Sequence, residues 1–182
     1  MSKFIQVDYE DKNGFFSPRG DLDGDRKEEF ANFDQFIGLV IEKDEYLLPI
    51  SDVAGILMLT PITYVPRSPN YVEGVINLRG TIIPTVNLRK LAGLKKGLRT
   101  PNTRIIIVKS QDFQIGFIVD GITYVQALSP NEIEQENLPF HNNGIDVITR
   151  IAKKKDTIYG IIDTQKILDI YAPITGQKED AA

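Results

Sequence analysis

Hydrophobic residues along most of the chain occur in short stretches that turn residues separate. From Asp34 onward these stretches are rich in Ile, Val, Thr and Tyr, the residue types that favour β-strands. They follow one another too closely for long helices to lie between them, so the pattern predicts an all-β protein made of small barrels or sandwiches. The predicted strands are 35–41, 46–50, 55–65, 74–78, 81–86, 103–109, 114–119, 123–128, 147–152 and 157–162.

Signals for helices are few and short. Asn87 and Asp163 each stand where an N-cap is expected, and they predict helices of about two turns at 88–92 and 164–170. The sequence Ser-Pro-Asn-Glu at 129–132 has the layout of a capping box, with proline at the first helical position.

The sequence also contains a faint internal repeat. Three apolar residues match three others that lie 69 positions later in the chain. In a second match, residues 86–91 correspond to residues 162–167, which lie 76 positions later. Chance similarity among apolar β segments is one explanation, but two five-stranded units of like topology explain both offsets. We therefore expect subdomain one over about 34–95, subdomain two over about 100–172, an apolar seam between them, and a disordered tail at 173–182. The matches at offset 69 are Ile50, Val53 and Ile56 with Val119, Ile122 and Val125.

The charged residues are unevenly distributed. Residues 1–35 hold nine acids and five bases and so carry the whole formal net charge of −4, while the rest of the chain balances 16 acids against 16 bases. Residues 1–33 are polar and irregular, which predicts a flexible acidic arm. A stretch starting at Asp21 begins like a calcium loop, but Arg26 and Asn32 stand where an EF-hand needs glycine and glutamate. A solvated acidic tail is the better interpretation.

Composition removes several classes of function. The chain has no cysteine, which excludes disulfides and thiol nucleophiles, and His141 is the only histidine, so we expect neither a metal nor a cofactor. The start of the chain lacks the apolar region of a signal peptide, and no apolar stretch approaches the roughly 20 residues of a membrane span. A neutral body offers no electrostatic surface for nucleic acid. These features predict a soluble cytoplasmic protein.

No grouping of residues points to catalysis. The glycines stand singly at turns and strand ends, so the sequence holds no glycine-rich phosphate loop. His141 lies in a stretch of loop composition, which favours a surface position, and carboxylates such as Asp120 and Asp163 occur where turn and cap roles explain them. An enzyme is therefore the weaker class, and a binding module is the stronger one.

One predicted hairpin suggests a binding surface. Residues 74–86 form two apolar stretches around Arg79-Gly80, where glycine permits the positive φ that a tight turn commonly needs. Arg79 is then expected at the tip of the hairpin, where it presents the five donors of its guanidinium. Taken alone, an arginine in this position is better explained as a solvated turn residue.

That hairpin resembles the core motif of the CheW family of chemotaxis coupling proteins. The family pattern is a G-V-x-N-L-R-G hairpin followed by I-P-x-x-D-L-R, and residues 74–89 follow it closely. The similarity extends from about Phe36 to Leu168 in several ordered motifs. They include 45–53, 62–66, 103–108, 116–122 and 159–168.

The resemblance implies a fold and a function. It implies two SH3-like five-stranded β-barrels packed together, with few short helices, and a scaffold without catalytic activity that is recruited to membrane receptor arrays without inserting into the membrane. The implied partners are the regulatory domain of a CheA-type histidine kinase and the cytoplasmic tip of a methyl-accepting chemoreceptor. Matching positions suggest partner surfaces at Val53, Gly55, Ile56, Asn77, Arg79, Gly80, Arg104 and Gly116.

Two positions depart from the family pattern. Gly55 stands where the family usually has glutamate, and on a partner surface it would remove a charge. Asn87 replaces the usual aspartate, but asparagine caps a helix about as well. These departures and the acidic arm leave open a specialised paralog of a pilus-motility or other non-flagellar chemosensory system. The alternative from another class is a catalytic CheW-like fusion fragment or an unrelated small β-barrel enzyme.

Overall fold

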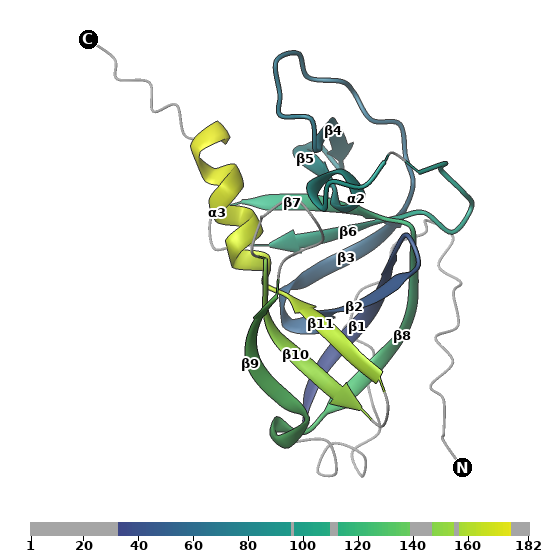
Figure 1. Cartoon of the computed structure of the whole chain (residues 1–182). Helices are drawn as coiled ribbons and strands as arrows, with labels where there is room; N and C mark the ends of the chain where they lie inside the picture. The colour runs from purple at the N-terminus through teal and green to yellow at the C-terminus, as the bar shows by residue number, and fades with distance from the viewer. Residues whose placement is uncertain (1–32, 96, 110–112, 139–146, 155–156, 176–182) are drawn as a thin grey trace.

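Figure 1 shows the protein as a computed structural model in which residues 33–95, 97–109, 113–138, 147–154 and 157–175 are described. In these ranges strands dominate, so the prediction of an all-β fold with few short helices is confirmed. The predicted arm, the calcium-like stretch and His141 lie outside the described residues, except for Phe33 at the end of the arm. The strands are β1 (Asp34–Ile41), β2 (Asp44–Pro49), β3 (Val53–Met58), β4 (Val72–Leu78), β5 (Thr81–Asn87), β6 (Arg104–Lys109), β7 (Gln114–Val119), β8 (Gly121–Leu128), β9 (Ile133–Leu138), β10 (Ile148–Lys154) and β11 (Thr157–Ile162).

Short helical elements connect some of the strands. The 3₁₀ turn η1 (Ile50–Asp52) joins β2 to β3, and a second turn, η2 (Pro130–Glu132), follows the predicted capping box. In that box the Glu132 carboxylate accepts hydrogen bonds from the backbone N–H and the hydroxyl of Ser129. Both predicted helices are present, as α2 (Leu88–Leu91) and α3 (Thr164–Thr175).

Two boundaries differ by more than two residues from those the sequence predicts, and one strand is absent from the prediction. Strand β3 ends at Met58 instead of 65, because the following segment contains Pro61 and contributes only the single bridge between Thr63 and Val75. Strand β9 was missed, since this edge strand has apolar residues only at its two ends, with four acidic and amide residues between them, and gives a weak hydrophobic signal. Helix α3 continues to Thr175, so residues 173–175 belong to the helix and not to a tail.

The strands form two sheets whose composition differs from the predicted split. Sheet A has the order β3-β6-β7-β5-β4, and sheet B has the order β8-β1-β2-β11-β10-β9. The subdomain boundaries at 34–95 and 100–172 are therefore wrong: β1 and β2 pair with the late strands, while β6 and β7 return to pair with β3 and β5. The prediction divided the chain at a connector of turn-like composition. Strands pair with whichever strands lie beside them in space, and the position of a connector in the sequence does not determine those partners.

The internal repeat nevertheless corresponds to the topology. Strands β3 and β8 are related by the offset of 69 and occupy one end of their sheets, and β5–α2 corresponds to β11–α3 at the offset of 76. Each unit also contains one parallel pair, β5 with β7 in sheet A and β11 with β2 in sheet B. In sheet B the roles of β6 and β7 are taken by β1 and β2. The second unit is thus completed by the first two strands of the chain.

Both sheets contribute to one shared hydrophobic core. In β6 the side chains alternate, so that Ile106 and Val108 enter the shared core while Ile105 and Ile107 enter a smaller core on the other face of sheet A. Sheet B has its own second core around Phe36 and Leu47. This shared core is the largest of the three and forms an apolar seam between the two sheets, not between the two predicted segments of the chain.

At the two places where the chain passes from one sheet to the other, an aspartate contacts the first turn of a helix. Asp120 lies between β7 and β8, and its carboxylate accepts from Arg89 of α2 at 2.7 Å and from the backbone N–H of Glu42 at 2.6 Å. Asp52 lies in η1 between β2 and β3, and it accepts from the hydroxyl of Thr164 in α3 at 2.5 Å. Each helix therefore holds in place one of the two segments by which the chain passes between the sheets.

Asn87 caps α2 and does more than an aspartate would. Its side-chain oxygen accepts from the backbone N–H of Lys90 at 3.3 Å, as the sequence predicts. Its amide group donates to Glu73 at 3.0 Å, which a carboxylate at this position would repel. Glu73 also forms an ion pair with Lys90 at 3.0 Å. The substitution of the family aspartate thus fits the buried Glu73 of this chain.

Among the described helices none is long and apolar enough to cross a lipid bilayer.

The ion pairs of Arg89 give the first prediction. Arg89→Met removes its bonds to Asp120 and Glu42 and leaves the Asp120 carboxylate short of donors, so we expect a loss of about 1–3 kcal/mol of unfolding free energy. The control is Lys153→Met, which breaks the exposed ion pair with Glu134 and should leave the melting temperature unchanged. Thermal melts of the two variants compare them, and equal small shifts would contradict the role given to Arg89.

Candidate functional site

The β4–β5 hairpin ends in the tight turn that the sequence predicts. Arg79 and Gly80 both have positive φ values, 52° and 90°, which match the twist of the paired strands. The side-chain oxygen of Asn77 accepts from the backbone N–H of Gly80 at 2.8 Å and closes the turn. Asn77, Arg79 and Gly80 are all exposed, so the structure brings three predicted site residues together at one hairpin tip.

One side of this hairpin is a partly apolar surface, which we call the hairpin face. Asn77 pairs with Ile82 and Val75 pairs with Pro84, so these four side chains project to the same side of sheet A. Ile82 is 60% exposed, and the bridge from Thr63 to Val75 extends the face along the edge of β4. The hairpin face is therefore an apolar strip bordered by an amide and by the Arg79 turn.

The opposite side of the hairpin is buried. Ile76 and Ile83 pair across the two strands and lie in the second core of sheet A, with exposures of 2% and 0%. Because buried partners fix both strands, the hairpin face keeps its geometry before any partner binds.

The structure places four other predicted site residues inside the protein. Val53 and Ile56 are 6% and 4% exposed and pack in the shared core, so their side chains are not on a partner surface. Gly55 is buried in β3. Gly116 is buried in β7, and a Cβ atom there would lie 2.8 Å from the Ile105 side chain. The reason is shared: β3 and β7 turn these positions towards core residues of neighbouring strands.

Arg104 lies apart from the hairpin tip, at a surface hollow between the two sheets. The hollow is lined by Val40, Asn102, Arg104, Asp120, Gly121 and Ile122. The Arg104 guanidinium donates to the carbonyl oxygens of Pro101 and Thr103 at 2.5 and 3.0 Å, and these contacts hold it at the start of β6. Both acceptors are uncharged carbonyl groups.

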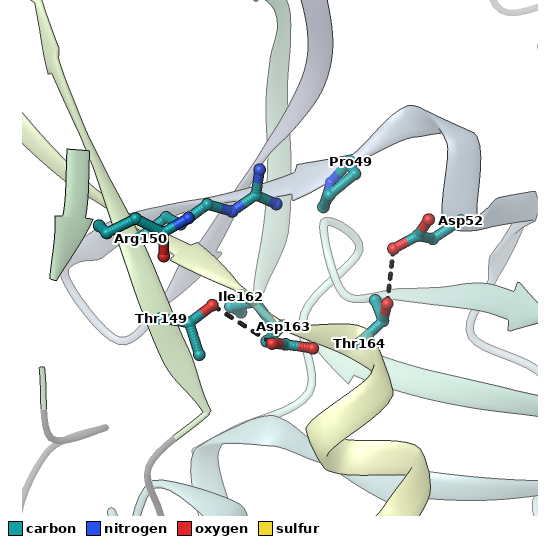
Figure 2. Close-up of a pocket in the computed structure, with 8 residues that line it drawn as sticks. Pro49, Asp52, Thr149, Arg150, Ile162, Asp163 and Thr164 are labelled. Atoms are coloured by element: carbon teal, nitrogen blue, oxygen red, sulfur yellow. Dashed lines mark hydrogen bonds between the residues drawn. The ribbon is translucent and has the colours of Figure 1, made fainter. Parts of the chain in front are cut away.

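A second, polar cleft lies where α3 begins (Figure 2). Thr149 donates to Asp163 at 3.2 Å, Thr164 donates to Asp52, and the Arg150 side chain extends along the cleft towards Pro49. These acids are occupied by cap and crossing contacts, so the cleft is explained by the join between helix and sheets. Within the described residues, no group of three or more His, Cys, Asp or Glu side chains gathers to hold a metal ion.

Sequence reasoning missed Ile82 and Pro84 as surface residues. The signal was ambiguous, because Ile82 and Ile83 are adjacent apolar residues and either could have faced the core. Only the register with β4 assigns Ile82 to the outer side.

Comparison with known proteins gives consistent matches. Residues 35–171 match the family model described as the CheW-like domain. The chain is 34% identical over 147 residues to the chemotaxis protein CheW of Helicobacter pylori, covering 80% of this chain and 87% of that protein. It is 32% identical over 141 residues to the chemotaxis protein CheW of Bacillus subtilis, covering 78% and 90%. The crystal structure of the scaffolding protein TtCheW from Thermoanaerobacter tengcongensis superposes with a TM-score of 0.66 at 33% identity, covering 71% of this chain and 88% of that one.

Two isoleucines test the distinction between core and surface. Ile56→Ala removes a side chain from the shared core, and we expect a loss of about 2–5 kcal/mol of unfolding free energy. Ile82→Ala makes the same change on the hairpin face, where the loss should stay below about 1 kcal/mol. Urea denaturation of both variants measures the difference. Similar losses would mean that the hairpin face is part of a packed interior.

Proposed function

The chain belongs to the CheW-like domain family, and we propose that it is a non-catalytic chemotaxis scaffold that couples chemoreceptors to a CheA-type histidine kinase. The observation that carries the proposal is the hairpin face, an exposed apolar strip on a hairpin whose other side is fixed in a core. Coupling requires binding surfaces and no reacting groups. A rigid, half-apolar surface with a polar border fits that requirement.

For the kinase, the proposed contact is the hairpin face. A partly apolar strip loses little conformational entropy on binding when its strands are already fixed, and burial of Ile82 contributes most of the apolar area gained. The partner with the matching chemistry is the kinase's own CheW-like regulatory domain, which would offer apolar hairpins of the same kind.

A coupling protein also needs more than one binding surface, and the internal repeat supplies a second candidate. Ile158 of β11 stands at the offset of 76 from Ile82 and is exposed to the same degree, 62% against 60%. Figure 1 shows the β4–β5 and β10–β11 hairpins at opposite ends of the molecule. Two exposed hairpin isoleucines, one for each sheet, support a scaffold that contacts two neighbours at once.

For the receptor, the proposed contact is the polar border at the hairpin tip. Arg79 has a backbone fixed by the turn, so its guanidinium is positioned to pair with a carboxylate or carbonyl group of the receptor tip. Asn77 stands beside it and closes the turn on which that position depends.

Charge reversal at Arg79 tests the receptor contact. Arg79→Glu should weaken binding of a receptor tip fragment by about 30-fold, equivalent to about 2 kcal/mol, because a favourable pair becomes a like-charge contact. The fold should be unaffected, since an exposed turn residue is worth within about ±0.5 kcal/mol. A binding titration and a thermal melt measure the two effects.

The matched control is Lys43→Glu, which reverses an exposed cation in the β1–β2 turn and should leave receptor binding unchanged. Unchanged binding by the Arg79 variant would return Arg79 to the role of a solvated turn residue. A collapsed melt would show instead that it is structural.

Truncation of Ile82 tests the kinase contact. Ile82→Ser removes most of the apolar area of the hairpin face, and we expect binding of the kinase regulatory domain to weaken about tenfold. Leu98→Ser is the control, because Leu98 is 92% exposed and lies outside the face. Calorimetric titration measures both variants, and equal affinities would count against the hairpin face as the kinase contact.

A further inference from the structure

The loop between α2 and β6 is basic and presents an exposed leucine. From residue 88 to residue 104 the sequence contains six bases and no acid. The structure describes five of these bases, and three of the five, Lys95, Arg99 and Arg104, follow α2 in the loop, where Leu98 is 92% exposed. We call Lys95, Leu98, Arg99 and Arg104 the basic ledge.

Contacts at its base hold the ledge in place. Arg89 donates to the carbonyl oxygen of Lys95 at 3.2 Å, and Gly97 packs so closely on Arg89 that a Cβ atom would lie 2.9 Å from its Nε. Arg99 reaches Glu73 at 3.5 Å. Because the loop is fixed at both sides of Leu98, the ledge can bind a partner without first becoming ordered.

The ledge adjoins the hollow between the sheets. One guanidinium, that of Arg89, contacts both the Lys95 carbonyl and Asp120, and Asp120 lines the hollow together with Arg104. The hollow adds the apolar walls of Val40 and Ile122. The combined surface therefore offers cations around apolar positions.

The charge of this surface is not neutralised within the described part of the chain. Among its five described cations, Arg89, Lys90 and Arg99 pair with the three acids Glu42, Glu73 and Asp120, and the described contacts of Lys95 and Arg104 are with other groups. Two positive charges remain in excess. A complementary partner carries acids next to an apolar anchor.

The chain itself contains a segment with that composition. Residues 21–30 hold five acids and two bases, and they include the apolar side chains Leu22 and Phe30. Residues 1–32 lie outside the described structure, and the described chain begins just before β1, whose far end at Val40 lines the hollow. From Asp34 to Val40 the strand covers roughly 20 Å, and a segment ending at residue 33 can extend about 30 Å within nine residues. The stretch 21–30 can therefore reach the hollow.

We propose that the acidic stretch 21–30 docks on the basic ledge and the adjoining hollow of its own chain. Linkage through β1 keeps the two at a high effective concentration, so a contact too weak to form between separate chains is populated within one. Docking covers Arg104 and the hollow. The arm thus competes with any partner that binds this surface. Its affinity for the surface falls as ionic strength rises.

The absence of cysteine allows a direct test in the full chain. Ser17→Cys, labelled with a nitroxide, places a paramagnetic probe beside the stretch 21–30. The backbone amide signals of Lys95, Leu98 and Asn102 should lose intensity at low salt and recover at high salt. The amides of Lys153 and Thr157, in the β10–β11 hairpin of sheet B, should not change.

Variants of the ledge identify the contact. Lys95→Glu and Leu98→Ser alter exposed side chains, and each should lower the ratio of docked to free arm about five- to tenfold, seen as recovery of the broadened signals. Lys109→Glu reverses an exposed cation at the other end of β6 and should leave the broadening as it is. Unshifted amide signals elsewhere verify that each variant is folded.

Three results would overturn the proposal. They are broadening spread evenly over the surface, broadening that Lys95→Glu leaves unchanged, and broadening that appears only between an isotope-labelled chain and a separate spin-labelled one. None of these results concerns the hairpin face. The proposed scaffold function is tested separately, by the binding titrations of the Arg79 and Ile82 variants.

Discussion

The two sheets depend on one constraint, which is that they share a hydrophobic core. Strands β1, β2, β6 and β7 lie in the middle of their sheets and send alternate side chains to the shared core and to a second core behind. Separating the sheets would expose to water the face of these strands that packs in the shared core. The chain crosses between the sheets only beside Asp52 and Asp120, and the first turn of a helix holds each crossing.

The second core of sheet A makes the exposed β4–β5 hairpin rigid. The β4–β5 hairpin leaves the body of sheet A with Ile76 and Ile83 buried on one side, so the outer side with Ile82 has little freedom to rearrange. Burial in the shared core likewise raises the pKa of the Tyr46 hydroxyl to about 12, with a smaller contribution from the charge of Asp44. The side chains that remain outside the cores therefore determine what such a protein can bind.

The repeat explains how one chain obtains two such surfaces. Each unit places a hairpin next to a short helix, and the equivalent isoleucines Ile82 and Ile158 both remain exposed. The connector that follows α2 in the first unit has become the basic ledge. In the second unit the strands that complete sheet B, β1 and β2, come from the start of the chain.

The sequence by itself determined the local features of this protein. Ten strands, both helix caps and the Arg79-Gly80 turn follow from patterns within a few residues, because strand propensity, capping and turn geometry are local effects. The family membership follows from several motifs that occur in order along most of the chain. Only the tertiary structure decided which strands share a sheet, and with it that Val53, Ile56 and Gly116 are interior while Ile82 is exposed. The physical reason is that, where two apolar residues are adjacent in a strand, their side chains point to opposite faces of the sheet, and either residue could be the buried one. The choice between them is made by hydrogen-bond register with strands distant in sequence.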